Sequence, residues 1–367
     1  MGIRRSILEA CVSTMRVLYR YREVKQPLSI LVLRNNDLGD VVAVTPLFRA
    51  LRMAFPDATL VAAVGAWSKE ILKYNPYLTK VIECNAPWHN HCTGPKSLLR
   101  PLRYIFQSPE VARLQAENFD VGIDVVGSPF GSMLLIHLRI PIRLGRKGYA
   151  GGHTGATDHI QASNSVSVAE GALEFVRLLK SDAEIDLGPQ PQLFLDPSEI
   201  EAAQEAWREM EAQSGNSGPR VVVAPGAGTP DKQWPVERFA ELASRLSPQV
   251  CGCVLGSPAD FALGETVVRG SNGWTNRCGR VSIRESMALI SLADLVICHS
   301  SFVMHLASAF NKRCILIMTR SLDWESHLTL WERPGVHFRA MPREGEEHVR
   351  VEDLEQQASL LLNAIER

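Results

Sequence analysis

The stretch SILVLRNNDLGDVVAVTPLFRALR (Ser29–Arg52) decides the fold. An apolar run ends at Leu33, two aspartates and a glycine follow it, and a helical pattern then begins. A buried strand followed by a helix is the repeating unit of an open α/β sheet, in which ligands bind at the carboxyl ends of the strands. Asp37, Gly39 and Asp40 occupy that position. The stretch therefore predicts both an α/β fold and a ligand-binding loop.

The same alternation of strand and helix recurs along the chain. Further apolar runs are ATLVAAVG (58–65), FDVGIDVVG (119–127), RVVVAPGAG (220–228) and DLVICHSS (294–301). Strands that alternate with helical segments indicate parallel sheets. Residues 182–219 interrupt the pattern with prolines, an acidic helix and the sequence SGNSGP, which is typical of a passage between domains. We therefore predict two successive α/β domains.

These patterns divide the chain into five predicted parts. They are a basic amphipathic segment (1–25), a first Rossmann-like domain (26–185), a linker region (186–218), a second Rossmann-like domain (219–345) and a terminal helix (346–367).

Composition narrows the functional classes. A net charge of -1 predicts no general attraction to nucleic acid. The eight cysteines show no paired spacing, which suits reduced thiols. We see neither an apolar run of membrane-spanning length nor a secretory signal, so we expect a cytoplasmic protein.

Residues 1–25 carry six basic side chains among apolar ones. A basic amphipathic segment can lie on an anionic membrane leaflet, which would place the protein peripherally at the inner face of the cytoplasmic membrane. The alternative is a helix that packs against its own domain and leaves its arginines in solvent.

A second loop follows the strand that opens the second half. PGAGTPDKQWP (225–235) combines glycines, which let a backbone approach a ligand closely, with a lysine whose charge can meet a phosphate. A helix started by proline follows, and helix amino termini bind anions. Gly228, Thr229 and Lys232 are therefore candidates for binding a phosphate. The alternative is a solvated lysine on an ordinary loop.

Four segments in order resemble glycosyltransferase family 9, the ADP-heptose:lipopolysaccharide heptosyltransferases. They are GDVVAVTPLFRALRMAFPDATL (39–60), FDVGIDVVGSPFGSMLLIHLRIPIRLGRK (119–147), APGAGTPDKQWPVERFAELA (224–243) and SIRESMALISLADLVICHSSFVMHLASAF (282–310). The resemblance implies a GT-B fold, in which two Rossmann-like domains face each other across a cleft. The acceptor then binds the first domain and the nucleotide-sugar the second, without a metal ion.

The resemblance also implies roles for single residues. Asp40 matches the aspartate that acts as general base, and Lys232 matches the lysine that binds the donor phosphate. An inverting transfer needs such a carboxylate to take the proton of the attacking hydroxyl. The alternative for Asp40 is a helix cap, because aspartate is a favoured capping residue. We expect Asp37 to orient the loop.

A third motif departs from the family pattern. Relatives read Asp-Thr/Ser-Gly-x-x-His before a helix that contacts the donor, and this chain keeps Ser301 and His305. The aspartate has become Ser300 and the glycine has become Phe302. The lost carboxylate removes a strong acceptor for sugar hydroxyls, so the identity of the donor sugar stays open.

The resulting hypothesis is an inverting glycosyltransferase. Its donor is a nucleotide-linked sugar, ADP-heptose by resemblance, and its acceptor is a glycan or a lipid-linked oligosaccharide. The alternatives are a nucleotide-sugar-binding protein without transferase activity and a membrane-associated scaffold. The cluster His89–Cys92 has no further ligand at a metal-binding spacing, so no metal is expected. No GxGxxG follows the first strand, which argues against a nicotinamide or flavin enzyme.

Overall fold

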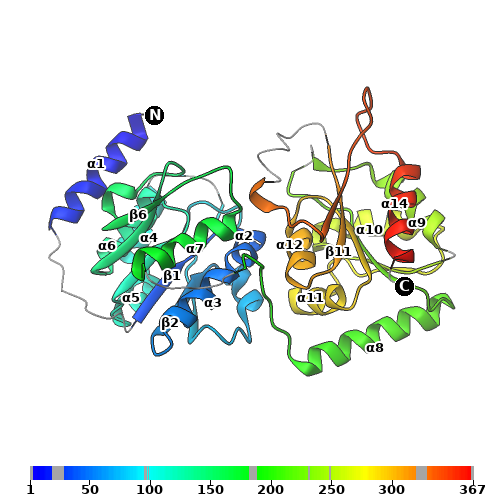
Figure 1. Cartoon of the computed structure of the whole chain (residues 1–367), viewed down its shortest axis with the longest axis horizontal. Helices are drawn as coiled ribbons and strands as arrows, with labels where there is room; N and C mark the ends of the chain where they lie inside the picture. The colour runs from blue at the N-terminus through cyan, green and yellow to red at the C-terminus, as the bar shows by residue number, and fades with distance from the viewer. Residues whose placement is uncertain are drawn as a thin grey trace. The chain divides into compact units, whose positions relative to one another are not determined.

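The computed structural model describes residues 3–18, 29–94, 97, 99–181, 188–229, 232–247, 249–319 and 329–364. The chain divides into two compact units, residues 1–191 and 192–367. Each unit contains one six-stranded sheet, and every pair of neighbouring strands is parallel (Figure 1). The prediction of two parallel α/β domains is therefore confirmed.

The sheet of the first unit has the strand order β3-β2-β1-β4-β5-β6. Its strands are β1 Ser29–Leu33, β2 Thr59–Val64, β3 Lys80–Glu83, β4 Val121–Asp124, β5 Ile142–Lys147 and β6 Asp158–Gln161. Strand β1 is the first in sequence and lies in the middle, because the chain adds two strands on one side of it and then three on the other. The order therefore reverses between β1 and β4.

Helices cover both faces of this first sheet (Figure 1). They are α1 Ile3–Leu18, α2 Leu38–Ala43, α3 Thr45–Ala54, α4 Leu99–Gln107, α5 Pro109–Ala116, α6 Pro129–His137 and α7 Val168–Leu179, with short 3-10 helices η1 Ala66–Leu72 and η2 His153–Gly155. Because both faces are covered, residues 30–33 of β1 are all buried rather than alternating, as is usual in parallel sheets.

The sheet of the second unit has the strand order β12-β11-β10-β7-β8-β9. Its strands are β7 Arg220–Ala224, β8 Cys251–Val254, β9 Trp274–Asn276, β10 Leu295–Cys298, β11 Arg313–Ile317 and β12 His337–Ala340. This strand order has the same pattern as that of the first unit. The chain builds two strands on one side of β7 and three on the other, so the order reverses between β7 and β10.

The second unit also contains most of the segment that the sequence marks as a linker. Its helices are α8 Pro197–Ser214, α9 Val236–Leu246, α10 Phe261–Val268, α11 Ile283–Ser291, α12 Phe302–Ala309 and α14 Val351–Asn363, with the 3-10 helix η4 Pro258–Asp260. Helix α8 packs against α11 through the fully buried Trp207, whose Nε1 donates to the carbonyl of Leu289 at 3.2 Å. Residues 186–187 of the predicted linker lie outside the described residues.

The amino-terminal helix α1 packs against its own unit. Val12 is fully buried, Leu8 and Met15 contact the same hydrophobic core, and the helix lies against α6 and η2. A guanidinium nitrogen of Arg16 donates to the carbonyl of Thr154 at 3.4 Å. The described part of the basic segment thus matches the packed alternative, while residues 1–2 and 19–25 lie outside the described residues.

Two further observations concern the chain as a whole. All eight cysteines are free thiols, of which six are buried and two, Cys11 and Cys92, are exposed. None of the helices in the described ranges is long and apolar enough to cross a membrane.

Candidate functional site

The loops singled out in the sequence lie where the strand order reverses. In the first unit the loop after β1 leads to Asp40, and in the second unit the loop after β7 leads to Lys232. Such a reversal at the carboxyl ends of the strands is the usual position of the ligand site in open α/β sheets. Asp37, Gly39 and Asp40 lie together in the first unit, and the other candidates lie in the second.

Asp40 lies in the first turn of α2 and is paired with a buried arginine. Nη2 of Arg34 donates to Oδ1 of Asp40 at 2.9 Å, and Nε of Arg34 donates to the backbone carbonyl of Asp40 at 3.2 Å. The side chain of Arg34 is 6% exposed and that of Asp40 is 25% exposed. The carboxylate is therefore held in place while part of it stays accessible to a substrate.

The groups around Asp40 have opposing effects on its pKa. Burial raises the pKa of Asp40 above its ordinary value, the charge of Arg34 lowers it, and the nearby charge of Asp37 raises it further. The net direction is upward. A carboxylate with a raised pKa binds a proton more strongly, which suits a general base.

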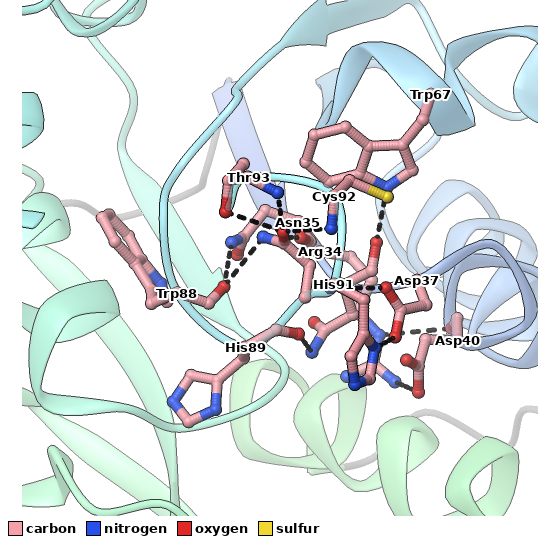
Figure 2. A network of polar contacts seen from close by, with 12 residues as sticks. Arg34, Asn35, Asp37, Asp40, Trp67, Trp88, His89, His91, Cys92 and Thr93 are labelled. Atoms are coloured by element: carbon pink, nitrogen blue, oxygen red, sulfur yellow. Dashed lines mark hydrogen bonds and ion pairs between the residues drawn. The ribbon is translucent and has the colours of Figure 1, made fainter. Parts of the chain in front are cut away.

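Asp40 is not the N-cap residue of α2, although its carboxylate hydrogen-bonds to the backbone of Asp37. The residue at the N-cap position is Asp37, and its side chain makes no capping hydrogen bond. Oδ1 of Asp37 accepts from the backbone N–H of His91 at 3.0 Å, and Oδ2 lies 2.6 Å from Nδ1 of His91 (Figure 2). Asp37 thus joins the loop after β1 to the loop after β3, and Gly39 lies between the two aspartates in α2.

Buried asparagines complete this junction. Nδ2 of Asn35 donates to the carbonyl of Trp88 at 2.8 Å, and Nδ2 of Asn36 donates to the carbonyl of His89 at 2.8 Å. Nδ2 of Asn90 donates in return to the backbone carbonyl of Asn35 at 3.1 Å. These hydrogen bonds hold the residues between β1 and α2 against the loop after β3.

Asp124 lies at the end of β4, on the other side of the reversal from β1. Its side chain is almost completely buried, and burial raises its pKa to about 6. Oδ2 accepts from the backbone N–H of Ser128 at 2.8 Å, and Oγ of Ser128 in turn accepts from the N–H of Gly131 at 2.9 Å. Asp124 therefore holds the turn into α6 rather than facing a substrate.

In the second unit the loop after β7 presents a lysine. The backbone N–H of Lys232 donates to the carbonyl of Thr229 at 3.2 Å, which closes a turn. Among the described residues no acceptor pairs with the Lys232 ammonium. A Cβ added at Gly228 would meet open space, whereas one added at Gly226 would lie 2.5 Å from Oδ1 of Asp260. The surroundings therefore require glycine at position 226, whereas a side chain would fit at position 228.

The loop after β10 carries the third predicted motif. Ser301 occupies the N-cap position of α12 without a side-chain capping bond, and Phe302 is the first residue of the helix. The ring of His305 lies edge-on to Trp331 with centroids 5.2 Å apart. The substituted position Phe302 therefore starts a regular helix. His299, at the start of the same loop, contacts the loop after β7 through Trp234 and Gly226.

No cluster that could hold a metal ion occurs in the part of the chain that the structure describes. In the His89–Cys92 segment, His91 is paired with Asp37, and Oδ1 of Asn90 accepts from the backbone N–H of Cys92 at 3.1 Å. These contacts hold the loop after β3 in place and join it to the loop that leads to Asp40.

Comparison with known proteins identifies the fold and then the family. The Veillonella parvula glycosyl transferase of family 9 superposes with a TM-score of 0.74 at 16% identity, covering 92% of this chain and 97% of that one. The Escherichia coli ADP-heptose lipopolysaccharide heptosyltransferase II superposes with a TM-score of 0.71 at 18% identity, covering 92% and 100%. The fold is that of the GT-B glycosyltransferases.

The family follows from sequence. The model of glycosyltransferase family 9 (heptosyltransferase) matches residues 111–333. The lipooligosaccharide heptosyltransferase 2 of Haemophilus influenzae is 23% identical over 303 residues, which cover 79% of this chain and 83% of that protein. This chain belongs to glycosyltransferase family 9. The prediction of a heptosyltransferase-like enzyme that takes sugar from a nucleotide donor is thereby confirmed.

Sequence reasoning missed the partners of the predicted residues. Arg34 directly follows an apolar strand, six residues before Asp40, and an arginine at that position is the available signal for a buried ion pair. His91 has no such signal, because its partner Asp37 lies 54 residues away in the sequence. The same holds for His299, whose Nε2 accepts from the backbone N–H of Trp234, 65 residues away. Only the folded chain brings them together.

The opposing effects on Asp40 generate a prediction. In Arg34→Gln the carboxylate loses its neighbouring positive charge, so we expect the pKa of Asp40 to rise further above its ordinary value. Arg34→Lys keeps the charge and should give a smaller rise. A pH titration of the Asp40 carboxyl carbon by 13C NMR measures both. An unchanged or lower pKa in Arg34→Gln would show that the guanidinium does not stabilise the carboxylate.

Proposed function

We propose that this protein transfers a sugar from a nucleotide diphosphate donor to a hydroxyl group with inversion, and that Asp40 is the general base. The acceptor oxygen forms a bond to the anomeric carbon as the bond from that carbon to the diphosphate oxygen breaks. The hydroxyl proton passes to the Asp40 carboxylate, and the electron pair of the broken bond leaves with the nucleotide diphosphate.

One observation supports this role above the others. Asp40 lies at the point where the strand order of the first unit reverses, partly accessible, with a raised pKa and with its position set by Arg34. A general base needs both reach and proton affinity. Asp37 lacks this combination, because its carboxylate is occupied by the backbone and ring of His91.

The donor is proposed to bind the second unit. Lys232 offers an ammonium without an acceptor among the described residues, and a side chain added at Gly228 would meet open space. Thr229 lies beside Gly228 in the same loop, and Ser301 and His305 lie at the start of α12. A cation and helix amino termini can hold a diphosphate without metal. The related Escherichia coli enzyme is an ADP-heptose lipopolysaccharide heptosyltransferase, so ADP-heptose is the first donor to examine.

The acceptor is proposed to be a glycan carried on a lipid, with the first unit resting on an anionic membrane. Helices α1 and α4 both pack against α6, and each leaves apolar side chains exposed. Val17 of α1 is 82% exposed, while Leu99 and Phe106 of α4 are 76% and 51% exposed. Leu99, Arg103 and Phe106 lie on one face of α4 because of their helical spacing. That face therefore presents both apolar side chains and a positive charge to a membrane surface.

Replacement of the proposed base separates chemistry from binding. Asp40→Asn should lower turnover by roughly 100- to 10,000-fold, the usual contribution of a general base, with ADP affinity unchanged. Asp37→Asn is the matched control in the same loop and should lose far less, because its partner His91 is exposed. Initial rates and calorimetric titration with ADP measure both quantities. Wild-type turnover in Asp40→Asn would remove Asp40 from the mechanism.

Replacement of the proposed phosphate lysine affects binding itself. Lys232→Ala should weaken ADP binding roughly 10- to 100-fold, the range expected for hydrogen bonds to charged groups. Lys312 provides the control, because it lies just before β11, at the opposite end of the strands. Lys312→Ala should leave ADP affinity close to wild type. Equal affinities in wild type and Lys232→Ala would refute the phosphate assignment.

The substitutions at the start of α12 bear on the choice of sugar. Because Ser300 is shorter and neutral compared with the aspartate of relatives, we expect wild type to discriminate weakly between ADP-heptose and an ADP-hexose. Ser300→Asp with Phe302→Gly should shift preference toward ADP-heptose. Initial rates with both donors decide this. A strong wild-type preference for heptose that the double change weakens would contradict the inference.

Membrane contact is tested by flotation with vesicles. The full chain should float with vesicles that contain anionic lipid and less with neutral ones. Leu99→Ser with Phe106→Ser should reduce flotation, whereas Met53→Ser, an exposed apolar residue on α3, should not. Activity on a water-soluble acceptor should be retained in all variants. Equal flotation of the double variant and wild type would exclude α4 from the contact.

A further inference from the structure

A buried histidine joins the two loops at the carboxyl end of the second sheet. His299 directly follows β10 and is 1% exposed. Its Nε2 accepts the backbone N–H of Trp234 at 2.8 Å, and its Nδ1 lies 3.3 Å from the carbonyl of Gly226. Gly226 and Trp234 stand at the two ends of the loop that contains Gly228 and Lys232.

The two partners determine the tautomer of His299. A backbone N–H can only donate, so Nε2 must present its lone pair, and a carbonyl can only accept, so Nδ1 must carry the hydrogen. Burial lowers the pKa of His299 to about 4, which keeps the ring neutral near pH 7. Neutral imidazole therefore supplies one acceptor and one donor at fixed positions.

Each contact of the ring is itself held by packing. The His299 ring lies edge-on to Phe239 of α9, with centroids 5.4 Å apart, and Phe239 lies edge-on to Trp234 at 4.8 Å. Nε1 of Trp234 donates to the carbonyl of Val349 at 2.9 Å. On the other side, Asp260 approaches Gly226 so closely that no side chain fits there. The ends of the loop thus have little room to move.

We propose that His299 is a positioning residue for the nucleotide donor: it ties both ends of the loop after β7 to the end of β10. The proposal rests on the proposed function, because it takes this loop as the phosphate-binding one. His299 does not contact the donor in this arrangement. It acts by setting where Lys232 and the amino terminus of α9 lie.

The physical reason is the cost of ordering a loop on binding. A loop that is already held near its bound conformation loses less conformational freedom when the diphosphate arrives. Without the acceptor at Nε2, the buried N–H of Trp234 would lack a partner, and the loop would have to shift to reach another one. Donor affinity should fall even though every atom that touches the donor is still present.

Two variants separate the hydrogen bonds from the packing. His299→Phe keeps an aromatic ring against Phe239 but removes both polar atoms. His299→Gln provides an amide oxygen at about the reach of Nε2 and can accept from Trp234. Titration calorimetry with ADP should show roughly 10-fold weaker binding in His299→Phe and an affinity within about 3-fold of wild type in His299→Gln. Donor KM should rise more than kcat falls, with acceptor KM unchanged.

The double variant with Lys232→Ala tests whether His299 acts through the lysine. If it does, adding His299→Phe to Lys232→Ala should weaken ADP binding by less than the product of the two single effects. Full multiplication would show independent action and overturn that route. If Lys232→Ala alone leaves ADP affinity unchanged, the proposed function fails at the loop itself. If Lys232→Ala weakens binding and His299→Phe does not, only the role of His299 is refuted.

A purely structural role gives a different result. His299→Phe would then lower the thermal midpoint while the folded protein, counted by the stoichiometry of the titration, binds ADP with wild-type affinity. That outcome overturns the proposal. Weaker ADP binding with restoration in His299→Gln supports it, and weaker binding that His299→Gln fails to restore would show that the bond to Trp234 is not the cause.

Discussion

Polar groups buried at the carboxyl ends of parallel strands must find partners inside the protein, and both units are organised by this requirement. In the first unit Arg34 emerges from β1 into the interior and is satisfied by the side chain and backbone of Asp40. In the second, the backbone at Gly226 and Trp234 is satisfied by His299. A missing partner at such a position costs about 1–3 kcal/mol, so these two loops have few alternative conformations.

The two units meet this requirement with different chemistry. The first unit pairs a carboxylate with a guanidinium, which leaves a group able to gain a proton at a defined place. The second uses a neutral imidazole and leaves the charge of Lys232 uncompensated among the described residues. Because the imidazole is neutral, it does not offset the positive charge of Lys232 that a diphosphate would meet. This difference agrees with the proposed roles of Asp40 as a base and of Lys232 as a phosphate-binding residue.

The fold and part of the site could be read from sequence because they depend on local patterns. Apolar runs, strand ends and helix starts are properties of neighbouring residues, and α9 begins at Val236, directly after the proline that predicts a helix start. Supporting contacts were beyond reach because they join distant segments, as Asn35 does with Trp88. The glycine signal shows the limit: the pattern favours Gly228, but the close approach of Asp260 falls on Gly226. Steric need depends on a neighbour that the pattern does not contain.

The distribution of thiols gives the protein a chemical handle. Six cysteines are buried and only Cys11 and Cys92 are exposed, one on α1 and one on the loop joined to Asp37. Partial burial and the charge of Asp37 raise the pKa of Cys92, which slows its alkylation because the thiolate is the reactive form. Replacement of Cys11 by serine would leave Cys92 as the one surface thiol. A maleimide dye attached there would lie on the loop that is hydrogen-bonded to Asp37 and would report, by its emission, on what binds near that loop.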